Sequence, residues 1–150
     1  SVIKSVIKSN DNRSSLLLKR TFEILNNKIK NKKICFLGVT FKANTDDMRD
    51  SSSLSMIPSL HKKGAKINYF DPTGEKNDFK KLKNVTFSND IKSAISNSDL
   101  IIIHTEWNDF KSINFNKLVK NKNYKIFDMR NIYSAKKMSE QKIKYFAIGS

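Results

Sequence analysis

The chain has 150 residues, of which 38% are hydrophobic, and this length suits one folded domain with its own core. Its single cysteine, Cys35, excludes a fold held by internal disulfides and indicates a reducing compartment. No apolar run approaches the roughly 20 residues of a membrane span, so we expect a cytoplasmic protein with no membrane partner. The two histidines, His61 and His104, fit no ligand pattern; we predict no metal site and interpret His104 as structural.

The formal net charge of +15 raises nucleic acid as a partner, because polyanions attract basic surfaces. The lysines, however, are scattered from end to end, and arginine occurs only at positions 13, 20, 49 and 130. Arginine is the side chain that binds phosphates through a bidentate fork, so its scarcity favours an ordinary solvated surface. A basic α/β module that binds nucleic acid remains the alternative from another class.

Helical and strand patterns alternate along the chain. A helical apolar stripe covers residues 1–30, and the polar patch over 9–15 could interrupt it. Short apolar runs predict strands over 34–39, 66–70, 85–87, 100–103, 125–127 and 145–148. Further helices are expected over 51–63, where Pro58 should cause a kink, and over 89–95, 115–119 and 135–141. This alternation predicts an α/β fold, a Rossmann-like open parallel sheet with helices on both faces.

One stretch, residues 32–53, joins a buried strand to a loop rich in charged side chains. Gly38 permits a sharp turn after the strand, and a serine run at the far end can cap the next helix. Between them lie Phe41, Lys42, Asp46, Asp47 and Arg49. Loops at the carboxyl edge of an open α/β sheet are where such folds bind ligands. Neither a G-x-G-x-x-G nor a phosphate-loop motif is present, so side chains and scattered amides would have to hold a nucleotide.

The same stretch resembles the start of the C-terminal, UDP-binding domain of the UDP-glucose/GDP-mannose dehydrogenase family. There a strand leads into G-x-x-F-K-x-x-T-D-D-x-R and a serine-rich helix start. The resemblance continues through the Asp71-Pro72 strand end, the T-E-W of residues 105–107 and the D-M-R-N of residues 128–131. It implies that residues 1–30 end a long helix that connects two domains and forms a homodimer contact. Residues 31–150 would then be the UDP-sugar-binding α/β domain.

The resemblance also implies roles for particular residues. Lys42 corresponds to the family's substrate-binding lysine, with Phe41 beside it, and Arg130 to the arginine that contacts the nucleotide-sugar. Arg49 matches the arginine that reaches the NAD bound mainly by the other domain. Met129 stands where the family has glycine, so close backbone approach to the ligand is not assured there.

No catalytic residue is assigned in this chain. The family's nucleophilic cysteine belongs to a region that the chain lacks, and Cys35, inside a strand, is expected to pack as a small apolar residue. Asp46 and Asp47 beside Arg49 could do acid/base chemistry, but we interpret them as a loop-fixing ion-pair network.

The enzyme implied by the resemblance oxidises UDP-glucose to UDP-glucuronate in two NAD-dependent steps, through a thiohemiacetal and a thioester on cysteine. This chain would be its C-terminal portion, able to bind the nucleotide-sugar but inactive alone. A UDP-N-acetylhexosamine or GDP-mannose dehydrogenase is the alternative within the family, and T-E-W with R-N-I-Y favours UDP-glucose. For residues 1–30, a helix packed on its own sheet or a separate dimerisation module are the alternatives.

Overall fold

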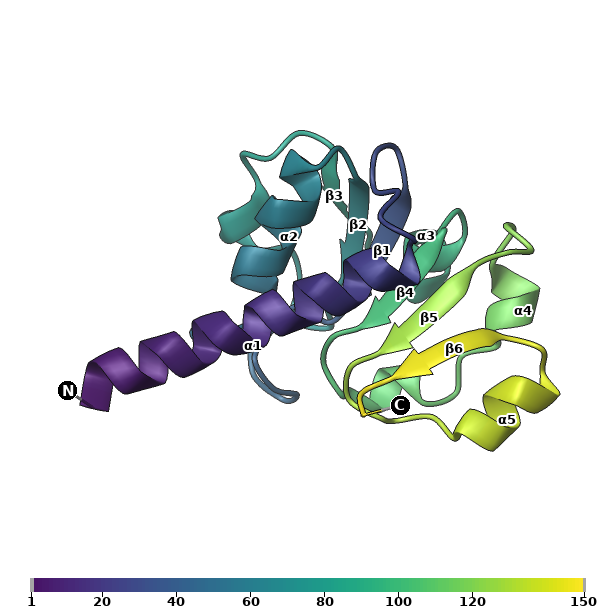
Figure 1. The fold of residues 1–150 in the computed structure, drawn as a ribbon. Helices are drawn as coiled ribbons and strands as arrows, with labels where there is room; N and C mark the ends of the chain where they lie inside the picture. The colour runs from purple at the N-terminus through teal and green to yellow at the C-terminus, as the bar shows by residue number, and fades with distance from the viewer. Residues whose placement is uncertain (1, 150) are drawn as a thin grey trace.

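Six parallel strands form one open sheet in the order β3-β2-β1-β4-β5-β6, as the ribbon in Figure 1 displays. The computed structural model describes residues 2–149, with side chains from residue 12 onward. The strands are β1 (Lys33–Leu37), β2 (Lys66–Phe70), β3 (Val85–Phe87), β4 (Leu100–Ile103), β5 (Lys125–Asp128) and β6 (Lys144–Ala147). The helices are α1 (Val2–Ile24), α2 (Ser53–Lys62), α3 (Ile91–Ile95), α4 (Phe115–Leu118) and α5 (Ala135–Glu140), with short 3₁₀ helices η1 (Asn77–Phe79) and η2 (Asn108–Phe110).

Apolar layers cover both faces of this sheet. Side chains alternate along a strand, so Ile34 and Phe36 of β1 join one layer while Cys35 and Leu37 join the other. The first layer packs against α1, α2 and η1, and the second against α3, η2, α4 and α5. The four residues of β4 are fully buried because both of its faces are covered. The predicted Rossmann-like fold is confirmed.

The strand order reverses between β1 and β4, which pair with each other in parallel at the centre of the sheet. From β1 the chain first builds outward through β2 and β3, then returns and continues outward through β4, β5 and β6. The loops after β1 and β4 therefore leave in opposite directions and open a crevice at the carboxyl edge. In open α/β sheets this crevice is where ligands bind.

The first helix is continuous from Val2 to Ile24, so the break considered over residues 9–15 does not occur. It ends six residues earlier than predicted, because Asn26 and Asn27 adopt left-handed backbone angles (φ 54° and 60°) that stop a helix. Leu17 and Ile24 are buried in the core of the sheet. The C-terminal half of α1 thus packs on its own domain, while its N-terminal half extends beyond the body of the molecule (Figure 1).

The second helix runs from Ser53 to Lys62 through Pro58 without interruption. The expectation that the serine run caps it through a side chain is wrong for Ser52, which holds the N-cap position but makes no such bond. The Ser52 hydroxyl instead lies 2.9 Å from Nε2 of His104, and the hydroxyls of Ser51 and Ser53 donate to the Val39 carbonyl. Through Ser51 and Ser53, the start of the helix is thus tied to the preceding loop.

Candidate functional site

The loop that follows β1 is anchored at its base by hydrogen bonds to residues at the end of β2 and at the start of α2. Val39 N–H donates to Oδ2 of Asp71 (2.9 Å), the buried carboxylate that ends β2. The Val39 carbonyl accepts the hydroxyls of Ser51 (2.5 Å) and Ser53 (2.6 Å) at the start of α2. These bonds satisfy buried backbone groups and fix the point from which the loop projects.

At Gly38 the chain leaving β1 passes close to Thr105 in the chain leaving β4. Its φ of +77° lies in the left-handed region, and a Cβ atom placed there would lie 2.5 Å from Cβ of Thr105. Thr105 uses this close approach to donate its hydroxyl to the carbonyl of Thr40 (2.8 Å). The glycine is therefore required both by backbone conformation and by space.

At the end of β5, Asp128 organises the loop that carries Arg130. Its buried carboxylate accepts the backbone N–H of Arg130 at Oδ1 (3.1 Å), and at Oδ2 the N–H of Tyr133 (3.0 Å) and the hydroxyl of Tyr145 (2.6 Å). The Arg130 guanidinium reaches across to Oε1 of Glu106 (2.9 Å) in the loop after β4. Arg130 thus links the loop after β5 to the loop after β4.

Met129 takes the place of the family glycine without backbone strain. The left-handed angle in this loop falls on Asn131 (φ 54°), and Met129 has no positive φ. Its side chain is buried in the core layer that packs against α1 and α2. The Met129 side chain also forms part of the wall of the pocket described next.

A pocket of about 300 Å³ lies at the carboxyl edge, where the strand order reverses. It draws residues from α1, the loop after β1, the start of α2 and the ends of β4 and β5. They are Arg13, Ser14, Phe41, Asp50, Ser52, His104, Met129 and Arg130. Two of the predicted substrate-binding residues, Phe41 and Arg130, therefore face one cavity.

A second pocket of about 250 Å³ adjoins the first and contains Lys42 and Arg49. Phe41 and Asp50 line both pockets, so they form the wall between the two. Phe41 is 49% exposed, so this boundary is open to solvent. Lys42 and Arg130 thus occupy neighbouring compartments of one edge rather than a single pocket.

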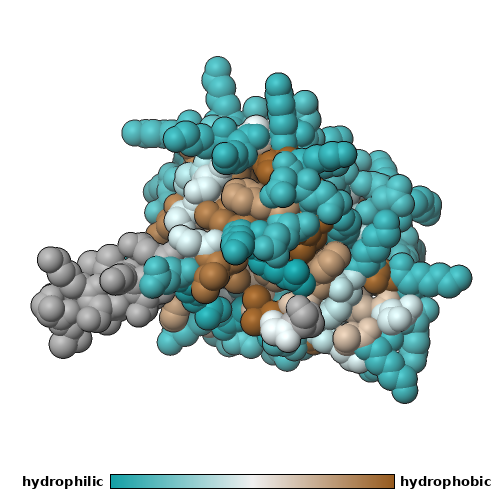
Figure 2. Space-filling model, in the orientation of Figure 1, coloured by the Kyte–Doolittle hydropathy of each residue, from teal (hydrophilic) through white to brown (hydrophobic). Residues whose placement is uncertain are grey.

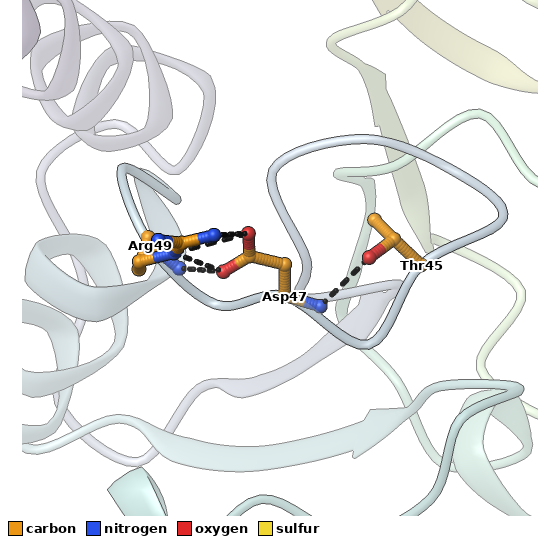
Figure 3. A network of polar contacts seen from close by, with 3 residues as sticks. All are labelled: Thr45, Asp47 and Arg49. Atoms are coloured by element: carbon orange, nitrogen blue, oxygen red, sulfur yellow. Dashed lines mark hydrogen bonds and ion pairs between the residues drawn. The ribbon is translucent and has the colours of Figure 1, made fainter.

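Arg49 is held by Asp47 in the loop after β1, as Figure 3 shows. Its Nε lies 3.0 Å from Oδ1 and its Nη2 lies 2.8 Å from Oδ2, a bidentate pair. Hydrogen bonds from the Arg49 side chain and backbone lower the pKa of Asp47 to about 2. Of the two adjacent carboxylates only Asp47 forms an ion pair within the described residues, so the loop-fixing interpretation holds for Asp47.

His104, interpreted from sequence as structural, forms part of the first pocket. Its ring lies between Oγ of Ser52 (2.9 Å from Nε2) and Oγ1 of Thr105 (3.1 Å from Nδ1). Burial, followed by the positive charges of Arg130 and Arg13, lowers its pKa to about 3. The imidazole is therefore neutral at physiological pH.

Sequence reasoning missed His104, Ser52 and Arg13 as pocket residues. His104 directly follows β4 at the carboxyl edge, and this position could have identified it. Arg13 lies on a helix distant in sequence, and no local pattern places it beside β5. Cys35, by contrast, is fully buried as predicted, and burial raises the pKa of its thiol.

In the T-E-W triplet after β4, Glu106 lies at the candidate site and Trp107 lies in the core. Glu106 pairs with Arg130, while Trp107 is buried and precedes η2. The Trp107 indole N–H has no hydrogen-bond partner among the residues described. Over residues 12–149, whose side chains the structure describes, there is no cluster of three metal-ligating side chains, and no described helix is long and apolar enough to cross a bilayer.

Comparison with known proteins identifies this architecture. A model of the UDP-glucose/GDP-mannose dehydrogenase family, UDP binding domain, matches residues 35–135. UDP-glucose 6-dehydrogenases of Rickettsia conorii and Rhizobium meliloti are 36% and 32% identical over 99% of this chain. The chain spans only 35% and 34% of those two relatives.

Solved structures agree at the level of the fold. A UDP-glucose dehydrogenase from Pyrobaculum islandicum superposes over 97% of this chain and 31% of its own, with a TM-score of 0.72 and 22% identity. An NDP-N-acetyl-D-galactosaminuronic acid dehydrogenase from Methanosarcina mazei Go1 covers 92% and 29%, with a TM-score of 0.74 and 22% identity. The chain belongs to the UDP-glucose/GDP-mannose dehydrogenase family and corresponds to its UDP-binding domain.

Proposed function

We propose that this chain is the nucleotide-sugar-binding portion of an NAD-dependent UDP-glucose 6-dehydrogenase, which as a whole oxidises UDP-glucose to UDP-glucuronate. One observation carries the proposal: Phe41 and Arg130, from loops far apart in sequence, line a single pocket at the reversal of strand order. The named relatives covering the whole chain are UDP-glucose 6-dehydrogenases, which supports this substrate. Alone, without an NAD-binding domain or the nucleophilic cysteine, the chain would bind but not oxidise.

The charges of the pocket suit a diphosphate. Arg13 on α1 and Arg130 after β5 contribute cations to the pocket, and the hydroxyl of Ser14 adds a donor. Guanidinium groups bind phosphate oxygens in charge-assisted hydrogen bonds, which are about twice as strong as neutral ones. Phe41 offers an exposed ring face for the apolar surface of the nucleoside. Lys42, in the adjoining pocket, would bind a further anionic or hydroxyl group of the same ligand.

Arg49 is proposed as this chain's contact to NAD. Its guanidinium uses Nε and Nη2 on Asp47, which leaves Nη1 for a phosphate of the dinucleotide. The side chain is 88% exposed and the chain has no glycine-rich fingerprint, so it fits a cofactor held mainly elsewhere. The cofactor would accept hydride from the sugar alcohol. Arg49 would hold the phosphates of the cofactor.

The N-terminal helix is proposed as the connecting and dimerisation segment, with residues 31–150 as the sugar-nucleotide domain in a cytoplasmic enzyme. Its N-terminal half extends away from the sheet (Figure 1), and Leu16 further along is 67% exposed. A homodimer through this helix would bury such apolar surface.

Calorimetric titration of the chain with UDP-glucose, UDP, UDP-N-acetylglucosamine and GDP-mannose tests the function. We expect saturable binding of one UDP-glucose per chain, competed by UDP and weaker for GDP-mannose. Preference for GDP-mannose would replace the substrate assignment. RNA binding that weakens steeply with salt, with no response to UDP, would favour the nucleic-acid-binding alternative.

A further inference from the structure

The hydrogen bonds around His104 fix which ring nitrogen carries its proton. The Thr105 hydroxyl donates its one proton to the carbonyl of Thr40, so Oγ1 of Thr105 must accept from Nδ1–H of His104. A neutral imidazole with its proton on Nδ1 has a lone pair on Nε2. The Ser52 hydroxyl therefore donates to Nε2, across 2.9 Å. In the free pocket the Ser52 proton is directed at the histidine and is not available to a ligand.

Positive charge dominates the surroundings of the ring. Arg13 approaches from α1 and Arg130 from the loop after β5, and both oppose a second proton on His104. The phenyl ring of Phe36, on β1, lies 6.0 Å from the imidazole, centroid to centroid. The carboxylates nearby are that of Asp50 in the pocket wall and that of Glu106, which pairs with Arg130. Two cations and a nearly water-free position keep the free-state ring neutral.

A diphosphate bound at Arg13 and Arg130 would reverse this balance, because it adds negative charge beside the two arginines that oppose a second proton on the ring. We propose that His104 senses the bound diphosphate: it takes up one proton at Nε2 when the pocket fills, and the Ser52 hydroxyl then turns from His104 to the ligand. The inference rests on the proposed function and adds His104 and Ser52 to the residues that position the substrate.

The step balances with one proton from solvent. That proton binds the Nε2 lone pair, and the new Nε2–H donates to Oγ of Ser52. The Ser52 hydroxyl, no longer donating to Nε2, donates to a phosphate oxygen. No covalent bond between heavy atoms forms or breaks, and Nδ1–H keeps its bond to Thr105. The imidazolium charge adds to those of the two arginines and favours the bound diphosphate.

The test is calorimetric titration of the full chain with UDP-glucose at pH 6.5, in buffers of different ionisation enthalpy. Because the diphosphate of this ligand is a diester, it has no phosphate group that titrates near neutral pH. We expect net proton uptake approaching one per bound ligand. We also expect the Kd to fall by up to about tenfold per pH unit as pH is lowered from 8 towards 6.

Two matched variants assign the proton, since the chain has only two histidines. H104Q keeps an amide that can hydrogen-bond Ser52 and Thr105 but cannot take up a proton, so its proton uptake should vanish and its Kd should be flat with pH. H61Q changes the half-buried histidine on α2, which lines no part of the pocket, and should keep the uptake of the wild-type chain.

The possible results of the titration distinguish a failure of this inference from a failure of the proposed function. No binding of UDP-glucose in any buffer overturns both. Binding with the same heat in every buffer, or uptake that persists in H104Q, overturns the role of His104 and leaves the proposed function intact. If H104Q does not fold, ¹⁵N histidine spectra of the wild-type chain decide. The Nδ1–H tautomer should become imidazolium on saturation, and an unchanged neutral ring overturns the inference.

Discussion

Gly38 is constrained twice, by its backbone angle and by its neighbour. At φ +77° an L-residue is strained, and an added Cβ would also meet Thr105 at 2.5 Å. Gly74 shares the first constraint, with φ +96°, but nothing lies within 4 Å of its missing Cβ. Alanine substitutions at these two glycines therefore distinguish the cost of backbone strain from the cost of a steric clash.

We predict that G74A lowers the free energy of unfolding by about 1–2 kcal/mol, the cost of a left-handed L-residue. G38A should cost roughly 1–3 kcal/mol more, because β1 and β4 must separate to admit the methyl group. Urea denaturation followed by circular dichroism measures both. Equal losses in the two variants would mean that the approach of Gly38 to Thr105 is not tight in solution.

Arg130 is the residue on which ligand affinity should depend most. R130A removes charge-assisted hydrogen bonds worth about 1.5–3 kcal/mol, so UDP-glucose affinity should fall about tenfold to a hundredfold while the fold persists. The matched control is R20A, an arginine on α1 that lies over the Phe146 ring and lines neither pocket. Unaltered affinity in R130A, or an equal loss in R20A, would remove Arg130 from the site.

Residue-level reading of the sequence succeeded where chemistry is local. The burial of Cys35 followed from its place within an apolar strand, and the Asp47–Arg49 pair from their spacing in one loop. It failed for His104, because whether a strand-end histidine lines a pocket depends on what the neighbouring strands bring opposite it. Arg13 could not be found at all, since only the packing of α1 on the sheet carries it to β5.

At the scale of elements, two buried carboxylates at strand ends hold the loops that bear the site. Asp71 accepts the N–H of Val39, and Asp128 accepts three donors, including the N–H of Arg130. An aspartate at the end of a buried strand can satisfy several loop donors at once, which favours one loop conformation before ligand arrives. This preorganisation lowers the entropic cost of binding.

D128N tests this role, because an amide has one acceptor oxygen for three donors. We predict a loss of about 1–3 kcal/mol in the free energy of unfolding and weaker binding of UDP-glucose, since the Arg130 loop loosens. Y145F, which removes only the phenol hydroxyl bonded to Asp128, should cost less and largely keep the affinity. Thermal unfolding and calorimetry measure the two effects; wild-type affinity in D128N would contradict preorganisation by this carboxylate.

The sequence predicted which helices and strands are present more accurately than it predicted where they end. The strand predictions over 66–70, 85–87 and 100–103 match the structure, because apolar runs bounded by polar residues mark buried strands. The end of α1 was missed because the stop is made by left-handed asparagines rather than by glycine. The serine run was misleading at Ser52, because its hydroxyl bonds to His104 and not to the first turn of the helix.

For the whole molecule, the reversal of strand order locates the site and α1 closes one side of it. On the face seen in Figure 2, hydrophilic residues cover much of the surface, and apolar ones gather next to α1. Exposed Leu16, on α1, and Ile148, after β6, line a cavity of about 430 Å³. The helix is therefore both a wall of the core and a candidate surface for a second copy of the chain.

Truncation separates these two roles of α1. Removal of residues 1–11 should leave the domain folded, because Leu17, Ile24, Leu25 and Ile29 remain buried in the core. Removal of residues 1–30 deletes these four side chains, worth about 1.5–3 kcal/mol each, and should unfold it. Circular dichroism checks the fold and sedimentation the oligomeric state. A folded chain without residues 1–30 would contradict the packing of α1.

Chemical-shift mapping of the chain titrated with UDP-glucose tests the central claim, that the ligand binds at the carboxyl edge. A separate cavity of about 310 Å³ contains Lys33 and Lys66 at the amino ends of β1 and β2, on the opposite edge of the sheet. It is the alternative binding site against which the claim is tested. We predict shifts confined to residues 13–14, 39–52, 104–106 and 128–131. Shifts centred on Lys33 and Lys66, or no shifts at saturating ligand, would contradict the claim.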